Sequence, residues 1–183
     1  MVISRIILVT GGARSGKSAL AERIAGQFAM PRIYIATAMA GDKEMSQRIA
    51  RHREMRGSGW LTVEESRDLT GALARTDGQG VRLVDCLTLW LANLISADDL
   101  AEDPANDPAD ATARLCATLG AQKSPVVLVT NELGLGIVPE NALARRFRDT
   151  HGLMNQSVAE IADQVWMSVS GLPLRLKPER ESP

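Results

Sequence analysis

The sequence predicts a single α/β domain with a mainly parallel central sheet and helices on both faces of that sheet. Five short apolar, β-branched stretches alternate with segments of helical periodicity, the order that produces parallel strands joined by helices. Most of the apolar stretches are continuously hydrophobic, as in strands that are buried on both faces. The length of 183 residues and the hydrophobic fraction of 45% are sufficient for one domain with a sizeable core.

Each predicted strand is a short apolar run. The first, "RIILVT" at 5–10, lacks the layout of a signal peptide and leads straight into a glycine turn, which favours a strand. The other four share its apolar, β-branched composition. They are "RIYIAT" (32–37), "VRLVD" (81–85), "VVLVT" (126–130) and "QVWMSVS" (164–170).

Helical patterns fill the intervals between these strands. The predicted helices cover residues 18–28, 43–56, 69–75, 87–95, 110–119 and 140–162. The segment 96–110 contains six acidic residues, no basic residue and two prolines, so it is predicted to be a mobile surface loop. The polar residues 178–183 are expected to form a tail, which leaves 1–177 as the domain.

The composition limits the partners and the compartment. A net charge of −1 lacks the basic excess of a general nucleic-acid binder, so no nucleic-acid partner is expected. No apolar run reaches the length of a membrane span, so we expect no stable membrane insertion. Cys86 and Cys116 are too widely separated for a disulfide framework or a metal knuckle. They are predicted to be reduced core thiols of a cytoplasmic protein.

The stretch "GGARSGKS" satisfies the phosphate-loop pattern G-x-x-x-x-G-K-[ST]. Its glycines let backbone N–H groups face a phosphate chain, Lys17 neutralises β/γ-phosphate oxygens, and the Ser18 hydroxyl can ligate Mg²⁺. A predicted strand precedes the motif and a helix follows it, so a chance glycine turn is the weaker interpretation. The predicted nucleotide-binding residues of the loop are Gly11, Gly12, Ala13, Arg14, Ser15, Gly16, Lys17 and Ser18.

A phosphate loop needs an acid that supports the metal at the end of a neighbouring strand. "VRLVD" supplies Asp85, which is predicted to hold Mg²⁺ together with Ser18, directly or through water. These parts predict nucleotide binding but not the reaction, because kinases, switch GTPases and ATP-driven motors share them. The guanine-specificity motif N-K-x-D is absent, and "VTNEL" after the fourth strand keeps only its asparagine.

A second candidate feature is an arginine-rich helix with one histidine. Arg48, His52 and Arg56 share a helix face, and Arg51 and Arg53 flank it. Surrounding cations disfavour the protonated imidazole, which would keep a nitrogen lone pair available for attack on an α-phosphorus. The residues alone leave the alternative open that this is a solvated helix face. Glu64 is likewise either a partner of these arginines, a metal ligand or an ordinary surface carboxylate.

Several segments together resemble one protein family. They are "ILVTGGARSGKS", "YIAT", the pattern R-I-x-x-H-R…R…W…T…E through residues 48–64, and "VVLVTNELGLGIVPENALARRFRD". In this combination the chain is similar to the bifunctional adenosylcobinamide kinase / adenosylcobinamide-phosphate guanylyltransferase family of cobalamin biosynthesis, from Ile7 to about Lys177. The resemblance implies a RecA-like P-loop NTPase fold and a homotrimer with sites near subunit boundaries.

The resemblance also implies two reactions and their substrates. The first phosphorylates adenosylcobinamide, a corrinoid, with ATP or GTP. The second transfers GMP from GTP to that phosphate through a guanylylated histidine, which corresponds to His52 here and makes His52 and Lys17 the expected catalytic residues. Outside the phosphate loop, the implied nucleotide contacts are Thr37, Arg53, Glu54, Met55, Arg56, Glu64 and Asp85.

The chain departs from the family pattern in places, and other functions remain open. Gly57 stands where relatives often have proline after arginine, and Asp85 stands where some have glutamate. His151 has no family role and is expected to be a polar surface residue. Asn131 and Glu132, after the fourth strand, are candidates for contacting the corrinoid or ordering the site, without a firm role. The alternatives are a simple small-molecule P-loop kinase without a nucleotidyl-enzyme, and a non-catalytic nucleotide-dependent switch.

Overall fold

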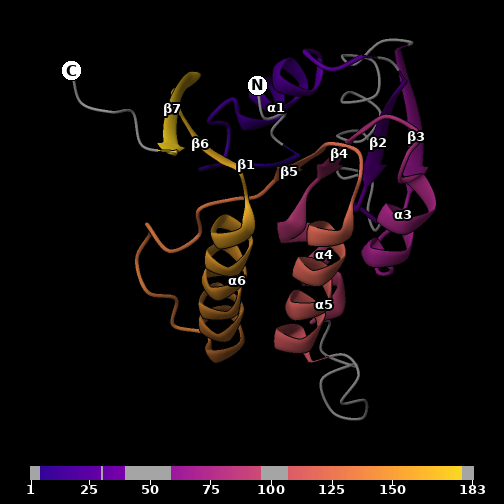
Figure 1. Cartoon of the computed structure of the whole chain (residues 1–183). Helices are drawn as coiled ribbons and strands as arrows, with labels where there is room; N and C mark the ends of the chain where they lie inside the picture. Colours follow the sequence, from indigo (N-terminus) through magenta and orange to yellow (C-terminus); the bar gives the residue numbers. More distant parts are fainter. Residues whose placement is uncertain (1–4, 30, 40–58, 96–106, 179–183) are drawn as a thin grey trace.

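The computed structural model describes residues 5–29, 31–39, 59–95 and 107–178. Its centre is a seven-stranded sheet in the order β3-β2-β4-β5-β1-β6-β7, shown in Figure 1. Neighbouring strands are parallel from β3 to β6, and β7 is antiparallel to β6. The strands are β1 (Ile6–Gly11), β2 (Arg32–Ala36), β3 (Trp60–Glu64), β4 (Val81–Asp85), β5 (Val126–Val129), β6 (Gln164–Val169) and β7 (Leu172–Lys177).

Five helices are described, and they cover both faces of the sheet. They are α1 (Lys17–Ala25), α3 (Leu69–Thr76), α4 (Leu87–Leu94), α5 (Pro108–Ala121) and α6 (Ala142–Ile161). Buried side chains of α1 pack with Ile7 and Val9 of β1, whereas those of the other four helices pack with Ile6 and Leu8. This alternation follows from the two-residue period of a strand, and it divides the core into two layers on either side of the sheet (Figure 1).

The five strands predicted from the sequence are confirmed, and the structure adds β3 and β7. Both lie at an edge of the sheet and are partly exposed, so neither has the continuous apolar run that marked the central strands. β7 pairs with β6 through a two-residue turn in which Ser170 (φ 51°) and Gly171 (φ 81°) have positive φ. The Ser-Gly pair is the sequence signal that could have identified this hairpin.

The helix predictions are confirmed within a few residues wherever the chain is described. The predicted helix 43–56 lies outside the described residues, as do residues 96–106 of the predicted acidic loop. The predicted end of that loop at residue 110 was wrong, because α5 already begins at Pro108 and includes Asp110. Asp107 is its N-cap, with the side chain accepting the N–H of Ala109 at 2.8 Å, and proline suits the first helical position.

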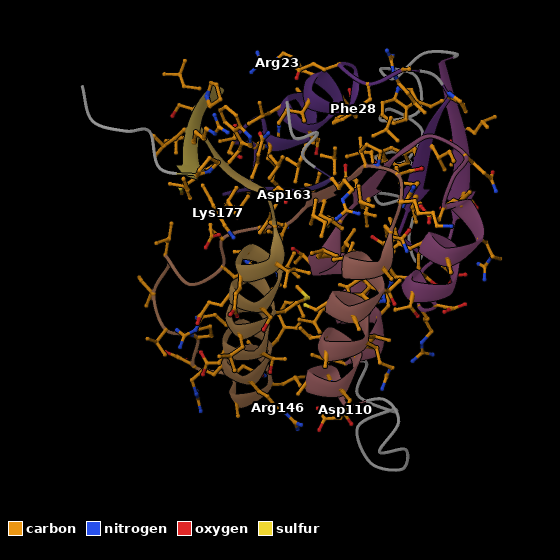
Figure 2. The ribbon with its side chains drawn as sticks, viewed as in Figure 1. Arg23, Phe28, Asp110, Arg146, Asp163 and Lys177 are labelled. Carbon is orange, nitrogen blue, oxygen red and sulfur yellow. The ribbon has the colours of Figure 1, made fainter. Side chains whose placement is uncertain are left out.

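The carboxyl end of α6 and the residues after it are hydrogen-bonded to β1 and to β7, near Asp163 and Lys177 in Figure 2. The Asp163 carboxylate accepts the backbone N–H groups of Arg5 at 2.7 Å and Ile6 at 2.9 Å, at the start of β1. Lys177 at the end of β7 donates to two carbonyls in the last turn of the helix. These contacts fix the strands that carry the phosphate loop and its neighbouring hairpin relative to the longest described helix.

Candidate functional site

The phosphate loop follows β1 at the carboxyl edge of the sheet, and its backbone needs glycine. Gly11 has φ 154° and Gly16 has φ 91°, and Arg14 adopts φ 56° between them. A Cβ at Gly11 would lie 2.6 Å from the backbone oxygen of Ser168, so no larger residue fits without displacing β6. The Ser15 N–H donates to the Gly12 carbonyl at 3.2 Å and closes the turn. The loop therefore has the curled backbone that the motif predicts.

The β6–β7 hairpin supports the loop through hydrogen bonds to Ser15. The Ser15 carbonyl accepts the N–H of Gly171 at 2.8 Å and the hydroxyl of Ser168 at 2.7 Å. The Ser15 carbonyl therefore points into the protein, and these two hydrogen bonds attach the loop to the hairpin. Gly16 also packs against the hairpin, since a Cβ there would lie 3.1 Å from the Cα of Gly171. The hairpin that sequence analysis missed is thus what holds the loop in shape.

Lys17 and Ser18 begin α1 directly after the loop. The Lys17 ammonium folds back over the loop and donates to the Gly12 carbonyl at 3.3 Å. Both side chains are half-buried, and Ala13, Arg14 and Gly16 are exposed around them. The N–H groups of the first turn and the positive dipole end of α1 lie at the same place, which favours an anion there.

Asp85 ends β4 at the same edge, but not beside the phosphate loop. We predicted that its strand neighbours the phosphate-loop strand, and this was wrong, because β5 lies between β4 and β1. The Asp85 carboxylate accepts the hydroxyl proton of Tyr34 at 3.1 Å. Tyr34 is only 5% exposed, so its hydroxyl restricts the orientation of the carboxylate at the end of a rigid strand.

The thiol of Cys86, next to Asp85, is affected by the charges of the site. Its pKa is raised to about 11, first by burial and then by the negative charge of Asp85, while the nearby Lys17 ammonium opposes the rise. The carboxylate at the end of β4 and the ammonium at the start of α1 therefore both act on the Cys86 thiol. The expectation of a reduced core thiol agrees with this protonated, buried Cys86, and Cys116 is also free and half-buried.

Thr37 and Glu64 stand at the ends of the next two strands. Thr37 is fully buried, and its hydroxyl accepts the Cys86 N–H at 2.7 Å and donates to the Cys86 carbonyl at 2.8 Å. This side chain joins the segments after β2 and β4, which holds Asp85 in place. Glu64 is the last residue of the edge strand β3, paired with Ala36, and its side chain is exposed.

The remaining predicted residues cannot be placed in this arrangement. His52, Arg53, Glu54, Met55 and Arg56 lie outside the described residues. The same holds for Arg48, Arg51 and Gly57. The segment that contains them joins β2 to the edge strand β3, and β2 is the strand that pairs with β4 beside Asp85.

Glu132 is a residue of the site that received no firm role from the sequence. It follows β5, which lies directly against β1, and its N–H donates to the Gly11 carbonyl at 3.2 Å. Its carboxylate Oε1 accepts the hydroxyl proton of Thr10, the residue before the loop. The signal was present in "VTNEL" after a predicted strand, but only the strand order shows that this strand adjoins the phosphate loop.

A buried polar network supports the segment that carries Glu132. His151 Nε2 lies 2.9 Å from the Thr88 hydroxyl and 3.2 Å from the Thr130 hydroxyl. Thr88 also accepts the backbone and side-chain N–H groups of Asn131, at 3.1 and 2.9 Å. The prediction that His151 is a surface residue was wrong, since it is 1% exposed between α4, α6 and β5. The periodicity of α6 did not show that His151 lies on its buried face, because that face is set by how the helix packs on the sheet.

Burial lowers the pKa of His151 from its ordinary value of 6.5 to about 4. Between these values the unfolded chain takes up a proton that the folded chain excludes. The stabilisation is thus complete above about pH 6.5 and is lost as the pH falls toward 4. We expect the wild type to lose about 3 kcal/mol more unfolding free energy than His151→Gln between pH 7 and 4, measured by urea titration. Parallel pH curves for the two proteins would contradict this role of His151.

The described residues offer oxygen ligands at the carboxyl edge of the sheet but no preformed cluster of metal ligands. Among them, no group of three or more His, Cys, Asp or Glu side chains is arranged to hold a metal ion. Mg²⁺ nonetheless fits the donors present, because it is commonly held by one or two protein oxygens together with substrate phosphates. The Ser18 hydroxyl and the Asp85 carboxylate are such oxygens at one edge of the sheet. In the described ranges, no helix has the length and apolarity that crossing a membrane requires.

Comparisons with known proteins identify relatives along almost the whole chain. A family model described as cobinamide kinase / cobinamide phosphate guanyltransferase matches residues 7–176. The chain is 47% identical over 174 residues to the bifunctional adenosylcobalamin biosynthesis protein CobP of Pseudomonas aeruginosa, covering 94% of this chain and 97% of that protein. It is 44% identical over 184 residues to the corresponding CobU protein of Salmonella typhimurium, covering 94% and 99%.

Solved structures confirm the fold class. An ATPase from the type III secretion system of pathogenic bacteria superposes with a TM-score of 0.54 at 17% identity. The match covers 90% of this chain but only 50% of the ATPase chain, so this chain spans half of its length. A Pyrococcus horikoshii protein superposes with a TM-score of 0.51 at 10% identity, covering 93% of this chain and 86% of that one. The predicted single-domain, RecA-like α/β P-loop fold is therefore correct.

Proposed function

Since this chain belongs to the cobinamide kinase / cobinamide phosphate guanyltransferase family, we propose that it is an enzyme of cobalamin biosynthesis with both activities. It first phosphorylates adenosylcobinamide with ATP or GTP. It then transfers GMP from GTP to adenosylcobinamide phosphate, and releases pyrophosphate. The observation that carries this proposal is the extent of the family match, because residues 7–176 include both the phosphate loop and the segment around His52.

The phosphate loop supports the first reaction. The N–H groups of the loop and the amino end of α1 bind the β- and γ-phosphates, and Lys17 neutralises their charge. The corrinoid hydroxyl attacks the γ-phosphorus, the bond to the β-phosphate breaks, and a nucleoside diphosphate leaves. When bound, Mg²⁺ supplies charge stabilisation at the phosphates, and Ser18 and Asp85 are the residues proposed to hold it.

The second reaction passes through a covalent intermediate on His52. An imidazole nitrogen attacks the α-phosphorus of GTP, the α–β phosphate bond breaks, and pyrophosphate leaves. The phosphate of adenosylcobinamide phosphate then attacks the same phosphorus and displaces the imidazole, which yields adenosylcobinamide-GDP. Arg53 and Arg56 are proposed to stabilise the charge on the phosphates, as arginine does in bidentate contacts.

Further nucleotide contacts are assigned by position and by family pattern. Asp85 and the ordering residue Thr37 follow β4 and β2 at the same carboxyl edge as the phosphate loop, with β5 between β4 and β1, and ligands of open α/β sheets bind at this edge. Glu64, Glu54 and Met55 complete the proposed nucleotide site. The enzyme is proposed to act in the cytoplasm as a homotrimer, with no nucleic-acid partner.

A product assay tests the whole proposal. The enzyme is incubated with adenosylcobinamide, GTP and Mg²⁺, and the corrinoid products are separated by chromatography. We expect adenosylcobinamide phosphate to appear first and adenosylcobinamide-GDP to follow, together with pyrophosphate. A simple P-loop kinase would stop at the phosphate, and a nucleotide-dependent switch would form neither product. Either of these two outcomes would refute the bifunctional assignment.

A further inference from the structure

We propose that Glu132 is the general base of the phosphorylation step. This inference rests on the proposed function and assigns to Glu132 the proton transfer that the phosphate loop cannot perform. A hydroxyl that attacks a phosphorus must lose its proton, and the residue that accepts this proton must lie within hydrogen-bond reach of the acceptor oxygen. Lys17 and the backbone N–H groups of the loop are donors and cannot serve.

The position of Glu132 at the sheet edge meets the first requirement. It follows β5, the strand between β1 with its phosphate loop and β4 with Asp85. Its backbone N–H is bonded to the Gly11 carbonyl at 3.2 Å, so it lies against the first residue of the loop. An acceptor substrate that approaches the γ-phosphate along the carboxyl edge meets this carboxylate.

The carboxylate is held in one orientation but keeps an acceptor. Oε1 receives the hydroxyl proton of Thr10, which is 4% exposed and therefore rigid. Among the residues that the structure describes, Oε1 is the oxygen of this carboxylate that has a hydrogen-bond partner, so Oε2 remains to accept a proton. The side chain is half-buried, and it is therefore partly open to substrate.

Asp85 is less suited to the same task. It is the carboxylate proposed to hold the metal, and it ends β4, which β5 separates from β1. Glu64 lies on the edge strand β3, with β2, β4 and β5 between it and β1. Of these three carboxylates, Glu132 is the one that follows a strand adjoining β1 and its phosphate loop.

The buried network behind Glu132 suits a catalytic position. Thr88 receives two N–H groups of Asn131, and the Asn155 amide donates to the Asn131 carbonyl at 3.0 Å. Thr130 donates to the Asn155 side chain at 2.7 Å. These bonds fix the backbone immediately before Glu132 to α4 and α6. Precise placement of a base is what such supporting contacts provide.

The proposed step balances in atoms and charge. The corrinoid hydroxyl oxygen forms a bond to the γ-phosphorus while its proton moves to Glu132 Oε2. The bond between the γ-phosphorus and the bridging oxygen breaks, and the nucleoside diphosphate leaves. Glu132 then returns its proton to water. The second reaction uses a phosphate oxygen as the attacking group, so it has no hydroxyl proton for Glu132 to accept.

This difference between the two reactions defines the test. Glu132→Gln keeps the size of the side chain and an acceptor for Thr10, but it cannot take a proton. We expect kcat for adenosylcobinamide phosphorylation to fall about 100- to 10,000-fold. Nucleotide affinity and GMP transfer to supplied adenosylcobinamide phosphate should stay within about threefold of the wild type. Glu140→Gln is the matched control, since this exposed glutamate belongs to the same segment after β5 and lies outside the site.

A second variant separates a base from a structural residue. Glu132→Asp retains a carboxylate, so it should phosphorylate adenosylcobinamide at a rate between those of Glu132→Gln and the wild type. It remains informative if the glutamine variant unfolds. The inference is overturned if Glu132→Gln phosphorylates at a near-normal rate, or if both reactions and nucleotide binding fall equally. A wild type that cannot phosphorylate would instead refute the proposed function itself.

Discussion

His52→Ala is expected to abolish the guanylyl-enzyme and to reduce GMP transfer by at least about a thousandfold, because the attacking nitrogen is removed and alanine offers no substitute. The wild type, incubated with GTP labelled in the α-phosphate, should acquire label that is released by acid and withstands base. Such lability is characteristic of a phosphoramidate bond. Phosphorylation of adenosylcobinamide should persist in the variant, since its attacking group is the corrinoid hydroxyl.

The second histidine of the chain provides the control for this experiment. His151→Gln removes a buried imidazole that contacts the hydroxyls of Thr88 on α4 and Thr130 after β5, so the adduct should form at the wild-type level at neutral pH. Label that survives in His52→Ala, or a wild type that acquires none, would contradict the nucleophile assignment. Loss of label in His151→Gln alone, with the protein still folded, would show that the adduct forms on His151 and not on His52.

Lys17→Ala is expected to impair both reactions, by roughly a hundredfold or more in kcat/KM for each. The lysine is the cation of the phosphate loop, and its ammonium lies over the Gly12 carbonyl at the amino end of α1. Without it, the negative charge that gathers on the phosphates loses its nearest neutralising group. Initial rates of phosphorylation and of GMP transfer, measured over a range of nucleotide concentrations, would give both kcat and KM.

Lys123→Ala is the matched control for charge, because Lys123 is exposed after α5 and is not part of the site. It should leave both reactions unchanged. If Lys17→Ala impaired only phosphorylation, two separate nucleotide sites would be indicated. Normal rates in both reactions would exclude a phosphate-loop role altogether.

The phosphate loop could be predicted from sequence because its chemistry is local. A strand, a glycine turn, Lys17 and the start of a helix occupy consecutive residues, and backbone sterics at Gly11 and Gly16 permit few other arrangements. The central strands were recognisable for the same reason, since burial on both faces requires a continuous apolar run. Edge strands are partly exposed and carry no such run, so β3 and β7 were missed.

Glu132 and His151 show where local information was insufficient. The sequence places Glu132 after a strand, but its contact with Thr10 depends on β5 being the neighbour of β1. His151 occupies a helix position that periodicity alone could assign to either face, and it is buried because α6 covers the sheet beside α4. Both outcomes depend on residues far away in the chain.

The sequence by itself determined the strand-loop-helix unit that binds phosphate, the alternation that gives a parallel α/β sheet, and the family pattern that includes His52. Those features arise from backbone sterics, residue spacing and side-chain chemistry within short segments. Only the tertiary structure decided that β5 separates Asp85 from the phosphate loop, that a hairpin supports Ser15, and that Glu132 adjoins Gly11. Strand order is set by which elements bury their apolar faces together, and that free energy is a property of the assembled core.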